Sequence, residues 1–162
     1  MRISRTNKPF VAISMGDPAG IGPEIIAGAL SSGRITAMAH FAVVADGGVM
    51  SEMLASRGIE ASVTRGADLA DGALEIPERG IVVIDPDEAL PVVEPGVPTD
   101  EGARKALHCL DLAADIVSSA GNVPGKALVT APVNKEKIAG IRPGFIGHTE
   151  YLRDRHGSDF VT

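Results

Sequence analysis

The 162-residue sequence is poor in aromatic side chains and in cysteine, with four Phe, one Tyr, no Trp and one Cys. So few rings exclude the nucleic-acid-binding modules that stack bases on aromatic side chains. The single cysteine, Cys109, cannot form a disulfide within the chain and is typical of a reducing compartment. We therefore expect a cytoplasmic protein whose fold depends on its apolar core.

The sequence also lacks an excess of positive charge and any long apolar run. Lys and Arg number 15 against 21 Asp and Glu, which gives a net charge of −6. That balance excludes a broad cationic surface for nucleic acid or anionic lipid. No apolar run approaches the ~18 residues of a membrane span, and the first eight residues lead into no secretory signal. We predict neither nucleic acid nor membrane as a partner.

Short apolar runs alternate with helical patterns along the chain, an order that predicts an α/β domain with a largely parallel sheet. We expect Thr99 to cap the longest helix and Gly121 to stop it, and Thr149 to cap a short helix that runs to Arg155. The chain ends as a further strand opens at 159–162, which we interpret as a truncation. The predicted strands are 10–14, 41–45, 61–64, 81–84 and 127–130, and the other predicted helices follow Pro23, Val49 and Asn134.

Ligands of open α/β sheets bind beyond the carboxyl ends of the strands, and three unusual segments take such positions. The first is Met15–Glu24, whose glycines allow a close approach of the backbone and precede a helix N-terminus that favours anions. It has neither the lysine of a P-loop nor the third glycine of the dinucleotide fingerprint. A tight turn and a ligand contact are equally good interpretations of it.

The second segment, Thr130–Lys135, places a lysine near a helix start, where the helix dipole disfavours a cation. Lys135 therefore indicates either an anionic ligand or a solvated surface lysine. The third segment, Gly144–Glu150, places His148 between small and apolar residues, with a hydroxyl and a carboxylate next to it. Such a group can hydrogen-bond a polar ligand, and histidine titrates near neutral pH.

No catalytic residue or metal site can be assigned from these residues. One His-x-Glu does not supply the three or more converging ligands of a metal site. We interpret His40, His108 and His156 as structural or exposed. There is no Gly-x-Ser-x-Gly motif, and Cys109 lies within a predicted helix rather than at a reactive helix N-terminus. The residues alone thus predict an α/β domain that binds a small anionic ligand.

The three segments together resemble the 4-hydroxythreonine-4-phosphate dehydrogenase (PdxA) family. The resemblance rests on residues 16–24 (GDPAGIGPE), 128–135 (LVTAPVNK) and 147–150 (GHTE), in this order across nearly the whole chain. It implies an isocitrate/isopropylmalate dehydrogenase-like sheet with flanking helices. By motif position, His148 and Thr149 carry over as substrate-binding residues. Asp17, Asn134 and Lys135 are weaker candidates without an assigned role.

The family's activity, as the resemblance implies it, is NAD- or NADP-dependent oxidation and decarboxylation of 4-hydroxythreonine 4-phosphate in pyridoxal phosphate (vitamin B6) biosynthesis. The implied enzyme is a homodimer with a divalent metal (Zn, Mg or Co) that polarises the developing ketone. Relatives with the same motifs act on threonate or erythronate phosphates or on cis-dihydrodiols, so these substrates are alternatives. A non-catalytic binding or assembly module is a third possibility.

Family chains continue well past the His-Thr-Glu segment. The resemblance therefore implies that residues 1–162 are the N-terminal part of a two-domain dehydrogenase. The metal ligands, the basic residues that hold the substrate phosphate and most of the NAD pocket are expected beyond Thr162. We expect this fragment alone to be inactive.

Overall fold

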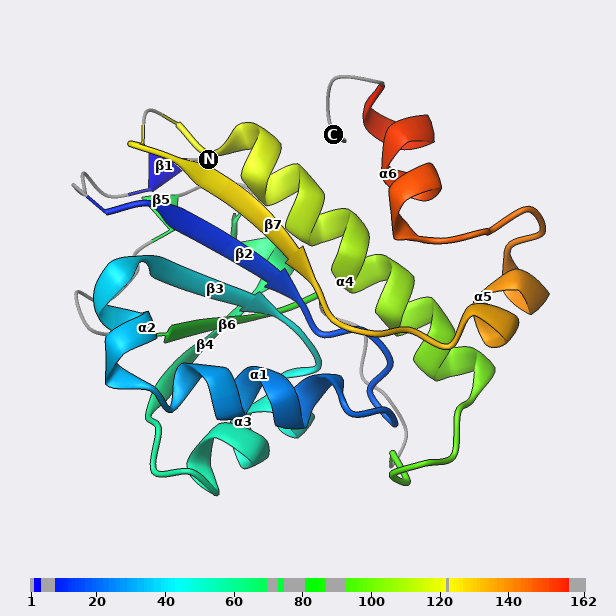
Figure 1. Cartoon of the computed structure of the whole chain (residues 1–162), viewed down its shortest axis with the longest axis horizontal. Coiled ribbons are helices and arrows are strands. Elements are labelled where there is room, and N and C mark those ends of the chain that lie inside the picture. Colours follow the sequence, from blue (N-terminus) through cyan, green and yellow to red (C-terminus); the bar gives the residue numbers. More distant parts are fainter. Residues whose placement is uncertain are drawn as a thin grey trace.

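The computed structural model of the chain describes residues 2–3, 8–69, 73–74, 81–86, 93–121 and 123–157 (Figure 1). The strands of its main sheet are separated along the chain by helices, apart from β4 and β6, and this order is the one that the sequence predicts. In chain order they are β1 (Arg2–Ile3), β2 (Phe10–Ser14), α1 (Gly22–Leu30), α2 (Gly33–Met38), β3 (His40–Val44), α3 (Gly47–Ala55), β4 (Ala61–Arg65), the 3-10 turn η1 (Gly66–Leu69), β5 (Ala73–Leu74), β6 (Ile81–Asp85), α4 (Asp100–Ser119), β7 (Lys126–Thr130), α5 (Lys135–Ile141) and α6 (His148–His156).

Five strands form one parallel sheet in the order β4-β6-β3-β2-β7, and β1 pairs with β5 separately. Phe10 of β2 is in register with His40 of β3 on one side and with Lys126 of β7 on the other. Because all five strands run the same way, their carboxyl ends share one edge of the sheet. The predicted α/β class and parallel sheet are confirmed.

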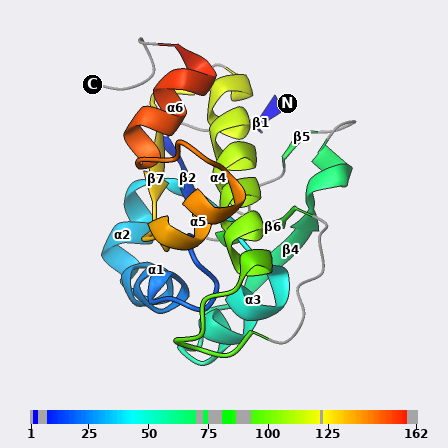
Figure 2. The same ribbon diagram turned by 90° about the vertical axis from the view of Figure 1, so that its right-hand side faces the viewer.

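Helices cover both faces of this sheet. In Figure 1, α1 and α3 lie together along one side, whereas α4 runs along the other, packed on β2, β3 and β7. The right-handed crossover rule explains this, because the chain moves across the sheet in one direction from β2 to β4 and in the opposite direction from β6 to β7. Figure 2 shows α6 beside α4, on the side of the helix away from β4.

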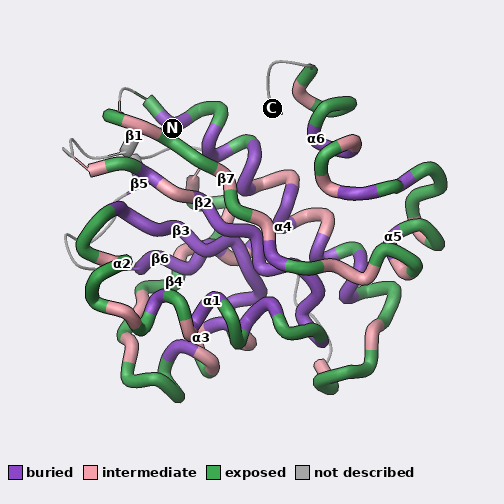
Figure 3. The backbone as a smooth tube through the Cα atoms, viewed as in Figure 1, coloured by how far each residue is buried: buried purple, intermediate pink, exposed green. Residues whose placement is uncertain are grey.

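The strands in the middle of the sheet are buried on both faces, as Figure 3 shows. Every residue of β3 is buried, and so are the first four of β6. This explains why their sequences are continuous apolar runs rather than alternating patterns. The edge strand β7 is more open, with Val129 47% exposed.

Helix α4 begins where the sequence predicts. The Thr99 hydroxyl accepts a hydrogen bond from the Gly102 amide at 3.0 Å, and two acidic residues occupy the first turn. One apolar face of α4 is buried, with Leu107 half-buried beside it; its buried residues are Ala103, Ala106, Leu110, Ala113, Ala114 and Val117. That buried face also includes Lys105, which is completely inaccessible and was not predicted to be buried.

One predicted helix start differs from the structure, and one helix was not predicted. Helix α6 begins at His148, so Thr149 lies inside its first turn, and the prediction that Thr149 caps this helix is wrong. The capping position belongs to Gly147, which provides no side chain. Helix α2 was not predicted at all, because none of its residues is buried and it shows no apolar stripe. The strand predicted at 159–162 lies outside the described residues.

Candidate functional site

The loops that follow β2 and β7 touch each other at the carboxyl edge of the sheet. The Asp17 amide donates a hydrogen bond to the Pro132 carbonyl at 3.0 Å. Gly16 has a positive φ of 76°, and a Cβ on it would overlap the same carbonyl oxygen. The first two segments singled out from the sequence are therefore adjacent, and the glycine is required where the two backbones meet.

Two of the weaker candidates form hydrogen bonds within their own loops. Asp17 is almost fully buried, and its Oδ1 accepts a hydrogen bond from the Ala19 amide at 3.0 Å. Asn134 caps α5, because its Oδ1 accepts from the Lys137 amide at 3.0 Å. Both side chains thus hold the shape of loops at the site. Contact of either with a ligand stays a prediction.

The second and third segments meet at Gly147. A Cβ at this position would lie 3.1 Å from Oε2 of Glu150 and 3.6 Å from Nζ of Lys135. Gly147 therefore leaves room for a cation from α5 and a carboxylate from α6. The structure brings Lys135 together with the His148–Glu150 turn, although 12 residues separate Lys135 from Gly147 in the sequence.

His148 is half-buried at the start of α6. Its ring meets the edge of Phe145 at 6.4 Å between centroids, with an interplanar angle of 88°. Burial, and then the positive charge of Lys135, lower the pKa of His148 below its ordinary value of 6.5. Its Nε2 atom is buried and has no hydrogen-bond partner among the described residues. The lowered pKa favours the neutral imidazole, and Nε2 is a polar atom at this turn that is unpaired among the described residues, while Thr149 beside it is exposed.

A buried charge cluster lies at the carboxyl ends of β3 and β6, and the sequence analysis missed it. Nζ of Lys105 is 2.9 Å from Oδ1 of Asp85 and 3.6 Å from Oδ2 of Asp46. Asp46 also caps α3 by accepting from the Val49 amide, and Asp85 accepts from the Gly47 amide at 2.8 Å. The detectable signal was a lysine within the apolar stripe of α4, together with an aspartate after each of two buried strands.

The described residues do not fit a metal ion. None of them form a group of three or more His, Cys, Asp or Glu side chains that could hold one. His148 and Glu150 lack a third ligand within this part of the chain. The predicted metal ligands beyond Thr162 stay a prediction.

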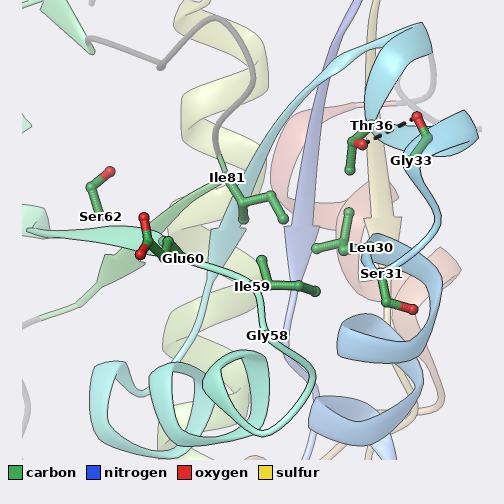
Figure 4. A pocket seen from close by; sticks show the side chains of 10 residues that line it. Leu30, Ser31, Gly33, Thr36, Gly58, Ile59, Glu60, Ser62 and Ile81 are labelled. Carbon is green, nitrogen blue, oxygen red and sulfur yellow. Dashed lines mark hydrogen bonds between the residues drawn. The ribbon is translucent and has the colours of Figure 1, made fainter.

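Two pockets differ in their relation to this edge of the sheet. One of about 330 Å³ lies between α1 and α3 beside the first segment, lined by Pro18, Gly20, Pro23 and Glu24 among others. Another, of about 770 Å³, opens at the amino ends of β4 and β6, away from all three segments. Figure 4 shows Leu30, Ile59 and Ile81 close together in it. None of the five predicted site residues lines either pocket.

A parallel sheet with helices on both faces, and with polar groups gathered beyond its carboxyl ends, defines an open α/β domain, the class in which ligands bind at that edge of the sheet. The sequence model of the family described as "Pyridoxal phosphate biosynthetic protein PdxA" matches residues 37–162, and this chain belongs to that family. The predicted family membership is therefore confirmed.

Among the described residues, no helix combines the length and the apolar character that a membrane span requires.

The relatives that match are named dehydrogenases. The chain is 34% identical over 152 residues to a 4-hydroxythreonine-4-phosphate dehydrogenase of Desulfosudis oleivorans, covering 94% of this chain and 44% of the relative. It is 32% identical over 143 residues to a D-threonate 4-phosphate dehydrogenase of Pectobacterium atrosepticum, covering 88% and 43%.

A solved structure of a 4-hydroxythreonine-4-phosphate dehydrogenase from Burkholderia phymatum superimposes with a TM-score of 0.73 at 25% identity, covering 92% of this chain and 44% of that one. The predicted dehydrogenase-like sheet with flanking helices is thus confirmed as the fold. The chain spans less than half the length of the relatives it matches.

Proposed function

We propose that this chain supplies part of the substrate-binding site of an NAD- or NADP-dependent dehydrogenase that oxidises and decarboxylates 4-hydroxythreonine 4-phosphate in pyridoxal phosphate synthesis. The observation that carries the proposal is the convergence of Lys135, His148 and Glu150 around Gly147. In this proposal residues 1–162 are the N-terminal part of a two-domain, cytoplasmic homodimer.

Each side chain has a role that its chemistry permits. The ammonium group of Lys135 attracts an anionic substrate. The free Nε2 of neutral His148 hydrogen-bonds a substrate hydroxyl or phosphate oxygen, and the exposed Thr149 hydroxyl supplies a second hydrogen bond. NAD accepts the hydride and a divalent metal polarises the ketone in such a reaction. The described residues form no group that could hold the metal ion, and the family resemblance implies that the residues holding the metal and most of the NAD lie beyond Thr162.

A second candidate substrate is D-threonate 4-phosphate, because a matching relative is named for it. Both substrates present a phosphate and a secondary alcohol to the same site. Lys135, His148 and Thr149 would recognise those shared groups, so they favour a phosphorylated hydroxy acid in general.

The proposal is tested with the protein of the complete reading frame, by following NADH formation with each phosphate as substrate. His148→Ala and Lys135→Gln should each lower kcat/KM at least about tenfold, since the first removes a hydrogen bond to the ionised phosphate and the second removes the cation that attracts it, each worth ~1.5–3 kcal/mol. Lys137→Gln, two residues further along α5, is the matched control and should leave kcat/KM unchanged. Turnover of neither substrate, or unchanged kcat/KM in both site variants, would refute the proposal.

We expect the 162-residue chain alone to produce no NADH, because its described residues form no metal-binding group and the family resemblance places the metal ligands and most of the NAD pocket beyond Thr162. Metal-dependent NADH formation by the isolated chain would contradict this part of the proposal. Light scattering and unfolding distinguish the dehydrogenase proposal from an assembly role. A monodisperse monomer that unfolds cooperatively would count against self-association through open sheet edges.

A further inference from the structure

Helix α6 carries His148, so the contacts between α6 and α4 determine where the imidazole lies (Figure 2). The phenol of Tyr151 donates a hydrogen bond to Oδ1 of Asp111 on α4 at 2.6 Å. The other carboxylate oxygen of Asp111 lies 3.4 Å from NH1 of Arg155. Asp111 therefore holds two side chains of α6 at once.

A second contact lies one turn further along both helices. NH2 of Arg155 donates to Oδ2 of Asp115 at 3.1 Å. Asp111 and Asp115 are four residues apart on α4, and Tyr151 and Arg155 are four residues apart on α6. Residues with this spacing lie on the same face of a helix. Two contacts at matching spacing fix both the rotation and the lengthwise position of α6 against α4.

His148 is three residues before Tyr151 and therefore shares its face of α6. Only Tyr151 and Leu152 are buried within this nine-residue helix. The Tyr151 ring packs on Phe145 at 5.7 Å between centroids, and the Arg142 guanidinium lies 4.7 Å above it. Tyr151 and Leu152 also join a buried apolar cluster with Leu110 and Ala114 of α4, so the polar contacts to Asp111 and Asp115 add direction to an attachment that apolar packing also supports.

We propose that Asp111 is a positioning residue for His148: through Tyr151 and Arg155 it holds α6 in the register that places the imidazole beside Lys135. Asp111 lies on α4, its contacts with α6 are those to Tyr151 and Arg155, and it acts on His148 through α6. The consequence for substrate binding rests on the proposed function, whereas the positioning of the imidazole does not.

The test measures the imidazole directly, by NMR titration of His148 in the 162-residue chain. Burial and Lys135 lower its pKa, and Glu150 is the other charged group at the turn, so the titration reports the surroundings of His148. Tyr151→Phe keeps the packed ring and removes only the hydroxyl. Asp111→Ala removes the shared acceptor. In both variants the pKa of His148 should rise toward 6.5, with the larger rise in Asp111→Ala.

The matched control is Asp154→Asn, which removes an exposed ion pair with Arg153 on the same helix and should leave the titration of His148 unchanged. Circular dichroism and urea unfolding establish that each variant is folded. If Asp111→Ala does not fold, Tyr151→Phe alone tests the proposal, because this variant keeps the packing of the aromatic ring. An unchanged pKa of His148 in folded Tyr151→Phe would overturn the proposal.

A separate measurement distinguishes this proposal from the proposed function. In the protein of the complete reading frame, Tyr151→Phe should raise KM for the phosphorylated substrate more than it lowers kcat. If the pKa of His148 shifts while KM and kcat do not, positioning by Asp111 stands and the substrate-binding role of His148 fails.

Discussion

The ammonium group of Lys105 is completely buried and lies 2.9 Å from the carboxylate of Asp85. This ion pair joins the inner face of α4 to the carboxyl end of β6. Removing one partner of a buried pair leaves the other charge without compensation, at a cost of ~3–5 kcal/mol. Because the Asp85 side chain keeps partial contact with solvent, we expect Lys105→Met to lower the free energy of unfolding by about 3 kcal/mol, measured by urea denaturation.

Lys137→Met provides the comparison for that prediction. Lys137 pairs with Asp100 at 3.2 Å, but both side chains are exposed, and such pairs contribute at most ~1 kcal/mol. Similar losses in the two variants would show that burial adds nothing to the Lys105 pair.

Gly16→Ala should destabilise the protein much more than Gly58→Ala. Both glycines have positive φ, 76° and 69°, which costs a residue with a Cβ ~1–2 kcal/mol. A Cβ at Gly16 also overlaps the Pro132 carbonyl, whereas at Gly58 it meets open space. Adding a packing cost of ~1–3 kcal/mol gives roughly 3 kcal/mol for Gly16→Ala. Equal unfolding midpoints for the two variants would contradict the close contact between the loops after β2 and β7.

Tyr151 should ionise at unusually high pH. Burial, and then its hydrogen bond to Asp111, raise the pKa of Tyr151 to about 12 from 10.0. The folded state thus keeps the proton longer than the unfolded state, so this contribution to stability is complete below pH 10 and is lost between pH 10 and about 12. Because Tyr151 is the only tyrosine, the phenolate absorbance of the native chain reports this group alone. A titration midpoint near pH 10 for the phenol of the native chain would refute the prediction. The same titration of the urea-unfolded chain provides the reference value.

Lys135→Gln should raise the pKa of His148 toward 6.5, because it removes the positive charge that adds to the effect of burial. A lowered pKa in the folded state favours the neutral imidazole. The contribution of neutral His148 to the free energy of unfolding is therefore present above about pH 6.5. It is lost as the pH falls below that value, because the imidazole of the unfolded state binds a proton at a higher pH than that of the folded state. NMR titration checks the shift, and Lys137→Gln should leave it unmoved. If the pKa of His148 is unchanged in Lys135→Gln, then Lys135 and His148 do not come together at Gly147.

The main features of the fold were predictable because they depend on local patterns. Continuous apolar runs marked the buried parallel strands, and Thr99 marked the start of α4 by a capping interaction within three residues. Helix α2 was missed because it buries no side chain and so leaves no periodicity. The start of α6 was misplaced because Thr149 is a good capping residue, whereas the true cap, Gly147, has no side chain.

The candidate site was predictable only in part. Sequence motifs identified Lys135 and His148, but their proximity depends on how α5 and α6 fold back against α4. The Lys105 cluster was not found, because the pairing of one lysine with Asp46 and Asp85 depends on the order of strands in the sheet. Neither distance along the chain nor residue type reveals that order.

The position of β2 within the sheet has a consequence for how the chain folds. Phe10 pairs with Lys126, 116 residues later, so one side of β2 has no partner until β7 has been synthesised. Contacts between residues so far apart in sequence slow folding, since a long loop must close before they form. During translation β2 and β3 can pair early, whereas α4 gains its full packing surface only once β7 has left the ribosome. We therefore expect a late folding step that joins β7 to β2.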